Sequence, residues 1–433
     1  MAESYIFTKK YISNLLRESS EESLISRLEK KDTPLPPRVP GGASISYEAI
    51  AKRLQLAQLS KSEEEMLVDP QTLELKEEYQ KNIENFIGTV KVPVGLVGPL
   101  RVNGLHAQGD YYIPLATSEA ALVASYHRGS LLISEAGGCS SVLLSEGVSR
   151  APGFVFYNLA DAGMFVKWCI DHLEHFKETA QSTTSHGKLS NLKANIDGNH
   201  VYLIFEYHTG DASGQNMVTF ATEAVIHFIL EHSPIKPVHH FIEANLSGDK
   251  KASTQSFHSV RGKKVTAEIR IPRPLIEKYL HTTPELMVKY WTLSAVGGVL
   301  SGCIGTQGHY ANGLAALYLA CGQDVACVAE SAIGITRIEL TEEDELYASV
   351  TLPSIMVGTV GGGTKLPSQQ SCLKIMGLAG NEKARSFAEV CAALALAGEL
   401  SIQGAICAHH FAKAHQRLAR KKKGDNFATD AYR

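Results

Sequence analysis

The sequence lacks a marked excess of charge of either sign and lacks an uninterrupted apolar run. Its 433 residues carry 42 Lys and Arg against 45 Asp and Glu. Because no positive excess is present, nucleic acid and anionic membranes are not favoured as partners. The longest apolar-leaning stretch, residues 390–408, is interrupted by Glu399 and Gln403, which is typical of a buried helix. The first ten residues lack the apolar core of a signal peptide. We expect a soluble, cytoplasmic protein.

Spacings typical of metal sites are also missing. None of the eight cysteines belongs to a C-x-x-C pair. His409, His410 and His415 do not have the i, i+4 spacing that places two ligands on one helix face. Most cysteines stand among Ala, Leu and Gly, as expected of reduced thiols in a cytosolic core. The sequence therefore predicts no metal site.

A Rossmann fingerprint is a third absence, although two glycine-rich segments are present. Neither Gly210-Asp-Ala-Ser-Gly-Gln-Asn216 nor Gly358-Thr-Val-Gly-Gly-Gly-Thr364 has the G-x-G-x-x-G pattern with an acidic residue about 20 positions later. The first segment precedes a predicted helix, whose N-terminus can bind a pyrophosphate. The second, including Gly361, Gly362 and Gly363, can direct backbone N–H groups at an anion, although a plain turn explains it equally well.

Changes in composition divide the chain into three parts. Residues 1–83 are charged and helical in pattern, with a helix-incompatible linker at residues 32–42, and form a predicted N-terminal arm. Residues 152–240 differ in composition from the segments on either side, and both of those segments carry isolated charges. We therefore predict that 152–240 is a small inserted domain within a large domain made of residues 84–151 and 241–433.

Local patterns predict the elements near these charges. We expect helices over residues 118–136, 216–232 and 383–415 and strands over residues 200–207 and 347–352. The first of these helices would be capped by Thr117 or Ser118 and would end at Gly137-Gly138.

Two isolated carboxylates indicate an enzyme. Glu119 and Asp324 each stand among small and apolar residues, in segments that a chain of this length can bury. Burial of a carboxylate is costly unless it is paired or protonated. Lys250 and Lys251 are cations that can form ion pairs with both carboxylates. Charges of this kind, far apart in sequence, predict an assembled acid/base site.

Two other functions compete with this interpretation. Cys139 or Cys407 with a histidine would make an acyl-transfer dyad, but neither stands in an electropositive context that favours a thiolate. A catalytically idle coenzyme A- or nucleotide-binding protein is the second alternative. The joint presence of Glu119, Lys250, Asp324 and His415 argues against it.

Taken in order, the motifs resemble those of the 3-hydroxy-3-methylglutaryl-coenzyme A (HMG-CoA) reductase family. The resemblance runs from about residue 84 to residue 415 and is closer to the eukaryotic and archaeal class than to the divergent bacterial class. The matching segments are Glu84-Asn-Phe-Ile-Gly88, Pro93-Val-Gly-Leu-Val-Gly-Pro99, Pro114-Leu-Ala-Thr-Ser-Glu119, Gly210-Asp-Ala-Ser-Gly-Gln-Asn-Met217, Asp249-Lys-Lys251, Ala320-Cys-Gly-Gln-Asp324 and Gly358-Thr-Val-Gly-Gly-Gly-Thr364.

The resemblance implies a fold and a reaction. The fold is α+β, with a large substrate-binding domain around a long central helix and an inserted, small ferredoxin-like cofactor domain. The reaction is the four-electron reduction of HMG-CoA to mevalonate and CoA with two NAD(P)H, the committing step toward isoprenoids. NADPH is the expected cofactor, with NADH as the alternative. The family builds its site between subunits, so we expect a homodimer or homotetramer with shared active sites.

The resemblance also assigns roles to individual residues. Lys250 would stabilise negative charge on the thioester oxygen, and Asp324 would keep Lys250 charged. Glu119 would protonate the aldehyde oxygen, and His415 would protonate the departing CoA thiolate. The implied HMG and CoA contacts are Arg150, Lys251, Asn312, Ser125, Arg128 and His309. The implied or proposed cofactor contacts are Asp211, Gly214, Asn216, Thr184, Ser185, His186, Lys188, Gly361, Gly362 and Gly363.

The sequence departs from the family pattern at several positions. Glu243 stands where the eukaryotic pattern has a serine on the HMG-binding loop, and Ser213 and Gln215 replace methionines in the cofactor loop. Ser185 stands where an arginine would grip the 2′-phosphate of NADPH, which leaves His186 and Lys188 as substitutes. Residues 416–424 contain no serine or threonine, so phosphorylation control of the eukaryotic kind is not expected there.

Overall fold

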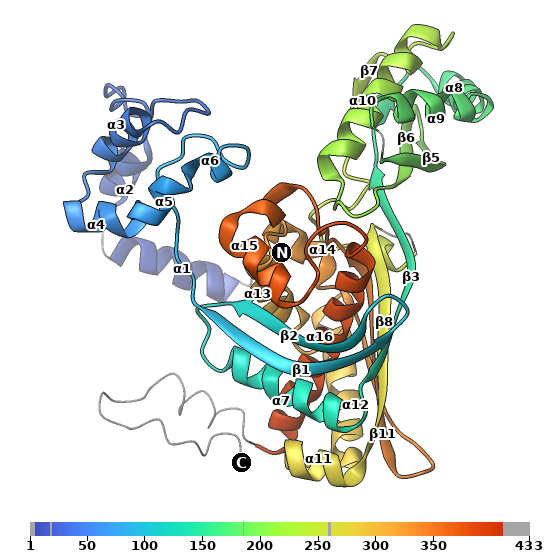
Figure 1. The fold of residues 1–433 in the computed structure, drawn as a ribbon. Coiled ribbons are helices and arrows are strands. Elements are labelled where there is room, and N and C mark those ends of the chain that lie inside the picture. Colours follow the sequence, from blue (N-terminus) through green and yellow to red (C-terminus); the bar gives the residue numbers. More distant parts are fainter. Residues whose placement is uncertain (1–4, 18–19, 185, 259–260, 410–433) are drawn as a thin grey trace. The chain divides into compact units, whose positions relative to one another are not determined.

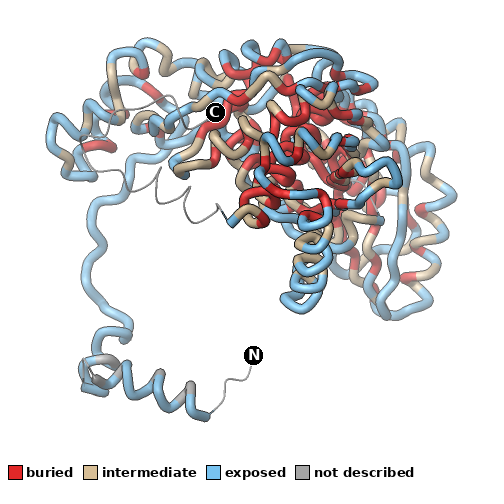
Figure 2. The backbone as a smooth tube through the Cα atoms, turned by 90° about the horizontal axis from the view of Figure 1, so that it is seen from below, coloured by how far each residue is buried: buried red, intermediate tan, exposed pale blue. Residues whose placement is uncertain are grey.

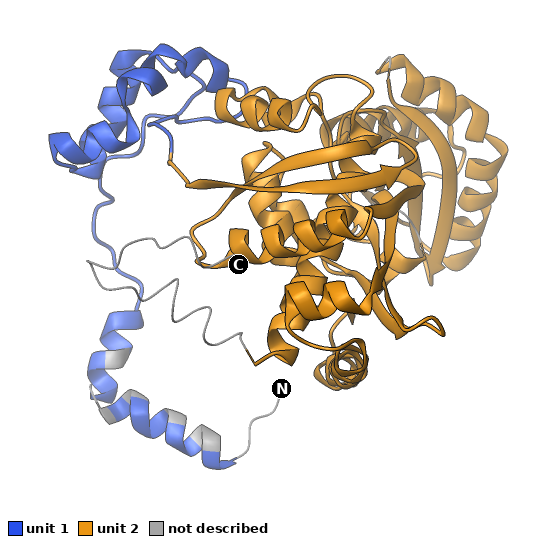
Figure 3. Ribbon diagram, turned by 60° about the horizontal axis from the view of Figure 1, so that its bottom comes forward, with its two compact units in different colours: residues 1–89 blue, residues 90–433 orange. Residues whose placement is uncertain are grey.

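A computed structural model describes residues 5–17, 20–184, 186–258 and 261–409. The chain forms two compact units, residues 1–89 and residues 90–433 (Figure 3). The first unit extends past residue 83, where composition places the end of the arm. The domain boundaries expected from the sequence stay a prediction.

Unit 1 consists of short helices whose starts carry side-chain caps. Ser20, Ser46, Ser60 and Asp69 each accept a hydrogen bond from a backbone N–H in the first turn of the following helix. The helices are α1 (Tyr5–Arg17), α2 (Glu21–Leu28), α3 (Tyr47–Ala57), α4 (Lys61–Leu67), α5 (Pro70–Glu74) and α6 (Lys76–Tyr79).

The core of unit 1 is small and includes one buried arginine. Ile50, Leu54 and Phe86 pack together. Beside them Arg53, only 4% exposed, donates hydrogen bonds to the carbonyls of four residues. The guanidinium therefore satisfies loop carbonyls that would otherwise be buried without partners.

The described part of unit 2 holds a mixed sheet in the order β7-β4-β6-β3-β8-β11-β10-β9, with β1 beside β2 and β3 and with β5 beside β6 (Figure 1). Its strands alternate with turns and helices along the chain. They are β1 (Val94–Gly104), β2 (Gln108–Ala116), β3 (Cys139–Arg150), β4 (Gly153–Val155), β5 (Lys188–Asp197), β6 (His200–His208), β7 (His239–Phe241), β8 (Gly262–Pro272), β9 (Gly305–Thr306), β10 (Gly334–Leu340) and β11 (Glu345–Ile355).

The segment from β4 to β7 has a ferredoxin-like arrangement. Helices α8 (Leu159–Asp171) and α9 (Leu173–Ser182) connect β4 to β5, and α10 (Gln215–His232) connects β6 to β7. The strands lie in the order β7-β4-β6-β5, and each neighbouring pair is antiparallel. This βαββαβ order agrees with the α+β fold expected from the resemblance. Strand β3 joins both parts of the sheet, because its residues 140–147 pair with β8 and its residues 148–150 pair with β6.

A long helix, α16 (Ala384–Cys407), forms the centre of unit 2 and packs against α7, β8, β11 and β3 (Figure 1). Within the described residues it is the one helix long and apolar enough to cross a membrane, but 89% of that window is buried inside the protein. Figure 2 shows the buried residues gathered in this interior. The helix is thus a core element, as its interruption by Glu399 and Gln403 predicted. The other helices are α7 (Leu122–Glu135), α11 (Arg273–Leu280), α12 (Pro284–Ser301), α13 (Tyr310–Ala320), α14 (Val328–Ser331) and α15 (Pro367–Ile375), with 3-10 turns η1 (Thr254–Phe257), η2 (Val325–Cys327) and η3 (Gly362–Lys365).

Glycine permits the close contact between α7 and α16. A Cβ at Gly129 would lie 1.9 Å from the carbonyl oxygen of Ala397, so no other residue fits at this crossing.

Two predicted helix boundaries differ from the structure. Helix α7 begins at Leu122 and not at residue 118, because Ala121 takes a left-handed conformation (φ 73°). Thr117 caps no helix, and its hydroxyl instead accepts a hydrogen bond from the N–H of Glu119 at 3.0 Å. The last helix is described to Cys407. Ala408 and His409 form a turn after it, and residues 410–415 of its predicted length, which include His410 and His415, lie outside the described residues.

Candidate active site

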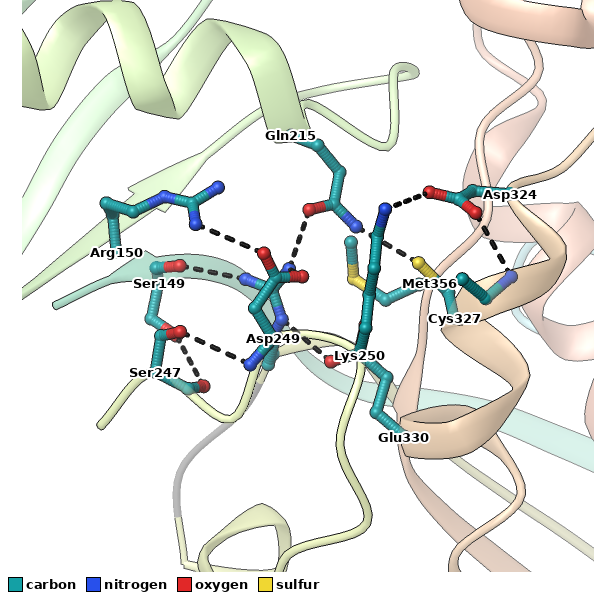
Figure 4. Close-up of polar contacts among 12 residues, drawn as sticks. Ser149, Arg150, Gln215, Ser247, Asp249, Lys250, Asp324, Cys327, Glu330 and Met356 are labelled. Carbon is teal, nitrogen blue, oxygen red and sulfur yellow. Dashed lines mark hydrogen bonds and ion pairs between the residues drawn. The ribbon is translucent and has the colours of Figure 1, made fainter. Parts of the chain in front are cut away.

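Lys250 and Asp324 form an ion pair, with Nζ 2.8 Å from Oδ2 (Figure 4). The hydrogen bond that Lys250 donates to Asp324 raises the pKa of Lys250 and keeps it cationic. The other carboxylate oxygen of Asp324 accepts from the N–H of Ala326 at the start of η2 (3.0 Å). The side chains are 44% and 42% exposed. The expectation that Asp324 is buried is therefore wrong, because it stands at the surface where α13 gives way to η2.

The lysine stands in a loop with an unusual backbone. Lys250 has a φ of 55°, in the left-handed region that non-glycine residues seldom adopt. Lys251, its neighbour, donates from Nζ to the backbone carbonyl of Asp249 at 2.9 Å. Strained residues of this kind persist only where their surroundings hold them.

A network of charges surrounds Asp249, directly before Lys250. Arg150 donates from Nη1 to Asp249 (3.1 Å) and to Glu243 (3.2 Å). Arg261 contacts the second oxygen of Asp249 and donates from Nε to Glu330 at 2.7 Å. Arg261 and Glu330 belong to none of the motifs recognised in the sequence. The one available signal was Glu330 itself, a lone carboxylate among apolar residues like Asp324.

Glu119 belongs to a second pair. Asn312 donates from Nδ2 to Glu119 Oε1 at 3.3 Å. Glu119 lies in the loop before α7 and is exposed, so the expectation that it is buried is also wrong.

The two pairs start from opposite ends of α13. Asn312 lies in its first turn, and Asp324 follows its C-terminus. At 1.5 Å per residue, this helix is roughly 16 Å long. Among the described residues, no hydrogen bond or ion pair connects Lys250 or Asp324 with Glu119. The described residues of one chain therefore contain the Lys250–Asp324 pair and the Glu119–Asn312 pair without a polar contact between the two pairs.

The residues expected near CoA surround the middle of α16. Ser125 lies 3.0 Å from the hydroxyl of Ser401, and Arg128 donates to the Ser401 carbonyl at 2.8 Å. Burial lowers the pKa of Arg128. His309 Nδ1 lies 3.6 Å from Glu399 Oε1.

The two glycine-rich segments contact each other. A Cβ at Gly358 would lie 2.6 Å from the backbone nitrogen of Ser213, and the N–H of Thr359 donates to the Asp211 carbonyl at 2.9 Å. The Asp211 carboxylate accepts from the backbone N–H groups of Glu382 and Ala384, at 2.7 and 3.1 Å, just before and at the start of α16. Asp211 thus joins the loop before α10 to the second glycine-rich segment and to the start of α16.

Glycine is required within these loops. Gly214 has a φ of 77°, and a Cβ there would lie 2.3 Å from the Thr209 side chain. Asn216 follows in the first turn of α10. Gly363 packs against Gly322, near Asp324, whereas Gly361 and Gly362 face open space.

The loop before β5 packs against the first turn of α10. Thr184 lies 3.0 Å from Met217 Sδ, and its hydroxyl accepts from the N–H of His186 at 3.2 Å. His186 and Lys188 are exposed. Ser185 lies outside the described residues.

The cysteines carry no activated nucleophile where the acyl-transfer alternative needs one. Burial raises the pKa of Cys139 to about 12 and that of Cys407 to about 11. Both thiols are therefore protonated at neutral pH. Seven of the eight cysteines are buried as expected, but Cys303 is exposed. Among the described residues, no group of three or more His, Cys, Asp or Glu side chains could hold a metal ion.

The site is typical of an enzyme that stabilises developing charge. It contains an anchored lysine–carboxylate pair, a carboxylate–amide pair and glycine-rich loops at a helix N-terminus. The family model for hydroxymethylglutaryl-coenzyme A reductase matches residues 49–420. The chain belongs to the HMG-CoA reductase family, an oxidoreductase family whose reaction converts HMG-CoA to mevalonate.

Individual relatives agree with this placement. The 3-hydroxy-3-methylglutaryl-coenzyme A reductase of Pyrococcus horikoshii is 46% identical over 349 residues, which are 78% of this chain and 84% of that protein. Reductase 1 of Dictyostelium discoideum is 35% identical over 421 residues, which are 94% of this chain and 75% of that protein. The expected similarity to archaeal and eukaryotic enzymes is confirmed.

Solved structures share the fold. A class II HMG-CoA reductase from Streptococcus pneumoniae, bound to NADPH in open conformations, has a TM-score of 0.62 and 20% identity. The match covers 84% of this chain and all of that one.

Proposed function

We propose that Lys250 is the group that stabilises negative charge when this chain reduces HMG-CoA to mevalonate and CoA. The ion pair with Asp324 carries the proposal, because it keeps the ammonium charged and limits its directions. One preorganised donor of this kind is typically worth about 3–4 kcal/mol in the transition state.

Proton transfers are assigned to two other side chains. Glu119, oriented by Asn312, delivers a proton to the aldehyde oxygen. His415 protonates the thiolate of departing CoA. Each assignment places a group that can hold a proton where the reaction creates a basic atom.

Substrate binding is assigned to residues around these pairs. Arg150 and Lys251 flank Asp249 and supply cations for the carboxylate of the HMG group. Ser125, Arg128 and His309 gather along α16 and serve the CoA portion. Arg150 already contacts Glu243, so the substrate carboxylate competes with Glu243 for this guanidinium.

The loop before α10 fits a nicotinamide cofactor. Among the described residues, no side chain caps α10, so its first N–H groups can bind a phosphate. Asp211 and Gly214 lie in this loop, and Asn216 lies in the first turn of α10. Gly361, Gly362 and Gly363 follow shortly after Gly358 and Thr359, which contact the loop. NADPH, when bound, supplies hydride. Thr184, Ser185, His186 and Lys188 are assigned to its 2′-phosphate.

We further propose that two copies of the chain complete the site, in the cytoplasm, as a homodimer or homotetramer. The exposure of Lys250, Asp324 and Glu119 supports this. So does an apolar face on α12, where Leu293, Val296, Val299 and Leu300 are each more than half exposed. An exposed apolar face of this kind is typical of protein–protein contacts.

Mixing two inactive variants tests the shared site. If Lys250 and Glu119 of different subunits meet, coexpressed Lys250→Ala and Glu119→Gln chains will form mixed dimers with one intact site. About a quarter of the wild-type activity should return. Activity that stays at the level of the separate variants would show that each chain forms its own site.

The role of Lys250 is tested by substitution. Lys250→Ala should lower kcat by about a hundredfold or more while HMG-CoA binding stays measurable by calorimetry. Lys251→Ala is the matched control and should mainly raise KM. Near-normal turnover in Lys250→Ala would remove this lysine from the mechanism and leave Lys251 as the candidate.

A further inference from the structure

Arg261 is a buried arginine that contacts four separate segments of unit 2. It is 3% exposed and stands directly before β8. Its Nε donates to Glu330 at 2.7 Å, its Nη1 to the Ser149 carbonyl at 2.8 Å and its Nη2 to Gln215 Oε1 at 2.8 Å. Nη2 also contacts Asp249. One guanidinium therefore links β3, α10, the loop of Lys250 and α14.

The contact with Asp249 acts on the neighbouring lysine. Arg150 contacts one carboxylate oxygen of Asp249 (Figure 4). Arg261 contacts the other oxygen. The next residue, Lys250, holds a left-handed backbone conformation. Two arginines on the preceding side chain restrict this backbone, and the direction of Nζ depends on it.

A second path leads to the partner of Lys250. Gln215 accepts from Arg261. Its Nε2 donates to Cys327 Sγ at 3.0 Å (Figure 4). Cys327 ends η2, the turn that Asp324 caps. Glu330, the counter-ion of Arg261, follows in α14. The guanidinium of Arg261 is therefore connected by hydrogen bonds to the segments that carry Lys250 and Asp324.

Stability alone is a poor explanation for this arrangement. The desolvation of a buried Arg–Glu pair offsets much of its attraction, so such pairs contribute little net stability. Apolar residues would fill the same space at lower cost. The contacts of Arg261 instead converge on the residues beside the candidate catalytic pair and on the first residue of α10.

We propose that Arg261, with Glu330 as its counter-ion, is a positioning residue that sets Lys250 against Asp324 and connects this pair to the cofactor loop through Gln215. The inference rests on the proposed role of Lys250. A positioning residue of this kind changes the transition state more than it changes substrate binding, because the buried Arg261 acts through the residues that it contacts.

A double-mutant cycle on the full-length enzyme tests the proposal. Arg261→Gln should lower kcat by about tenfold or more and change KM for HMG-CoA by less than about threefold. In the Lys250→Ala background, the same change should lower kcat by less than about twofold, because its target is already gone. An equal loss in both backgrounds would overturn the proposal, and so would an unchanged kcat in the wild-type background.

The matched control is Arg53→Gln. Arg53 is also buried and also makes hydrogen bonds to four residues, but it belongs to unit 1. It should lower the midpoint of urea unfolding without changing kcat. If Arg53→Gln lowered kcat as much as Arg261→Gln, the effect would come from the loss of a buried arginine and not from positioning.

A milder variant covers the case in which Arg261→Gln does not fold. Gln215→Met keeps the volume and removes the bridge from Arg261 to Cys327. It should lower kcat by about threefold or more in the wild-type background and have no effect in Lys250→Ala. Full activity would refute the connection through Gln215. Failure of the proposed function is a separate result, because it appears in Lys250→Ala alone.

Discussion

Replacing Glu399 by glutamine should loosen the start of α13 and thereby disturb Glu119. Glu399 is fully buried on α16 and accepts hydrogen bonds from the N–H groups of Gly308 (2.8 Å) and His309 (2.9 Å) and from the Thr336 hydroxyl (2.8 Å). Burial alone would raise the pKa of Glu399, but the hydrogen bonds from His309 and Gly308 outweigh it, and the pKa lies below its ordinary value.

The magnitude follows from the donors that lose their acceptor. Glutamine keeps one oxygen and presents an NH₂ group to donors that previously faced the second oxygen. Hydrogen bonds to a charged group are worth about 1.5–3 kcal/mol each. Loss of one such bond, with a second one weakened, lowers the free energy of unfolding by about 2–5 kcal/mol.

The pH dependence gives this loss a signature. Because the folded pKa of Glu399 is below the unfolded value of 4.5, its contribution is present above pH 4.5 and is lost as pH falls through the folded pKa. The difference in free energy of unfolding between wild type and Glu399→Gln should therefore shrink as the solution is acidified below this value. Urea titrations followed by circular dichroism measure it.

A matched control exists on the same helix. Glu389 is also fully buried and accepts from the N–H groups of His106 (2.8 Å), Ala107 (2.7 Å) and Leu143 (3.1 Å). Glu389→Gln should lose similar stability. Only Glu399→Gln acts on α13, which carries Asn312, so it alone should also lower kcat, by about tenfold if the proton donor is misplaced. Equal kcat in the two variants, with both folded, would refute the connection from Glu399 to the site.

Three further predictions concern separate properties. With Ser185 in place of an arginine, preference for NADPH over NADH should be modest, because only His186 and Lys188 are left to bind the 2′-phosphate. The double variant His186→Ala with Lys188→Ala should remove the preference, and one that survives would place the phosphate elsewhere. Burial lowers the pKa of Lys263 below its ordinary 10.5, so between the folded pKa and 10.5 the unfolded chain binds more protons and the free energy of unfolding rises with pH. Lys263→Met should abolish this rise, which urea titrations at a series of pH values up to 10.5 would measure. Finally, His415→Gln should depress reduction of HMG-CoA and spare reduction of free mevaldehyde, which releases no thiolate; equal losses on both substrates would make the histidine structural.

Local sequence predicted the elements around the site well where the signal was local. The helix at residues 216–232 and the strand at residues 347–352 lie within α10 and β11. The pairing of Lys250 with a distant carboxylate also followed from counting isolated charges. The start of α7 could not be predicted in this way, because residues 118–121 have a composition that suits a helix. The left-handed conformation of Ala121 ends the loop that carries Glu119, and α7 begins after it.

Long-range contacts explain what the sequence did not predict. Arg261 and Glu330 are 69 residues apart, and neither belongs to a recognisable spacing. Exposure was predicted wrongly for Glu119 and Asp324, because apolar neighbours show that a segment approaches the core and not which way one side chain points. Both residues stand at the ends of buried elements, where an apolar local composition does not imply that a side chain is buried.

The exposure of the Lys250–Asp324 pair bears directly on how the site must work. A pair with both side chains more than two-fifths exposed is screened by water and contributes about 1 kcal/mol or less by itself. An oxyanion donor worth about 3–4 kcal/mol requires a dry, preorganised surrounding. Lys250 therefore needs a partner surface or a bound substrate that excludes water when it acts. The same requirement holds for Glu119, which is also exposed. Two exposed pairs at opposite ends of α13 are explained together if a second copy of the chain closes over each, and the return of activity in mixed dimers decides it.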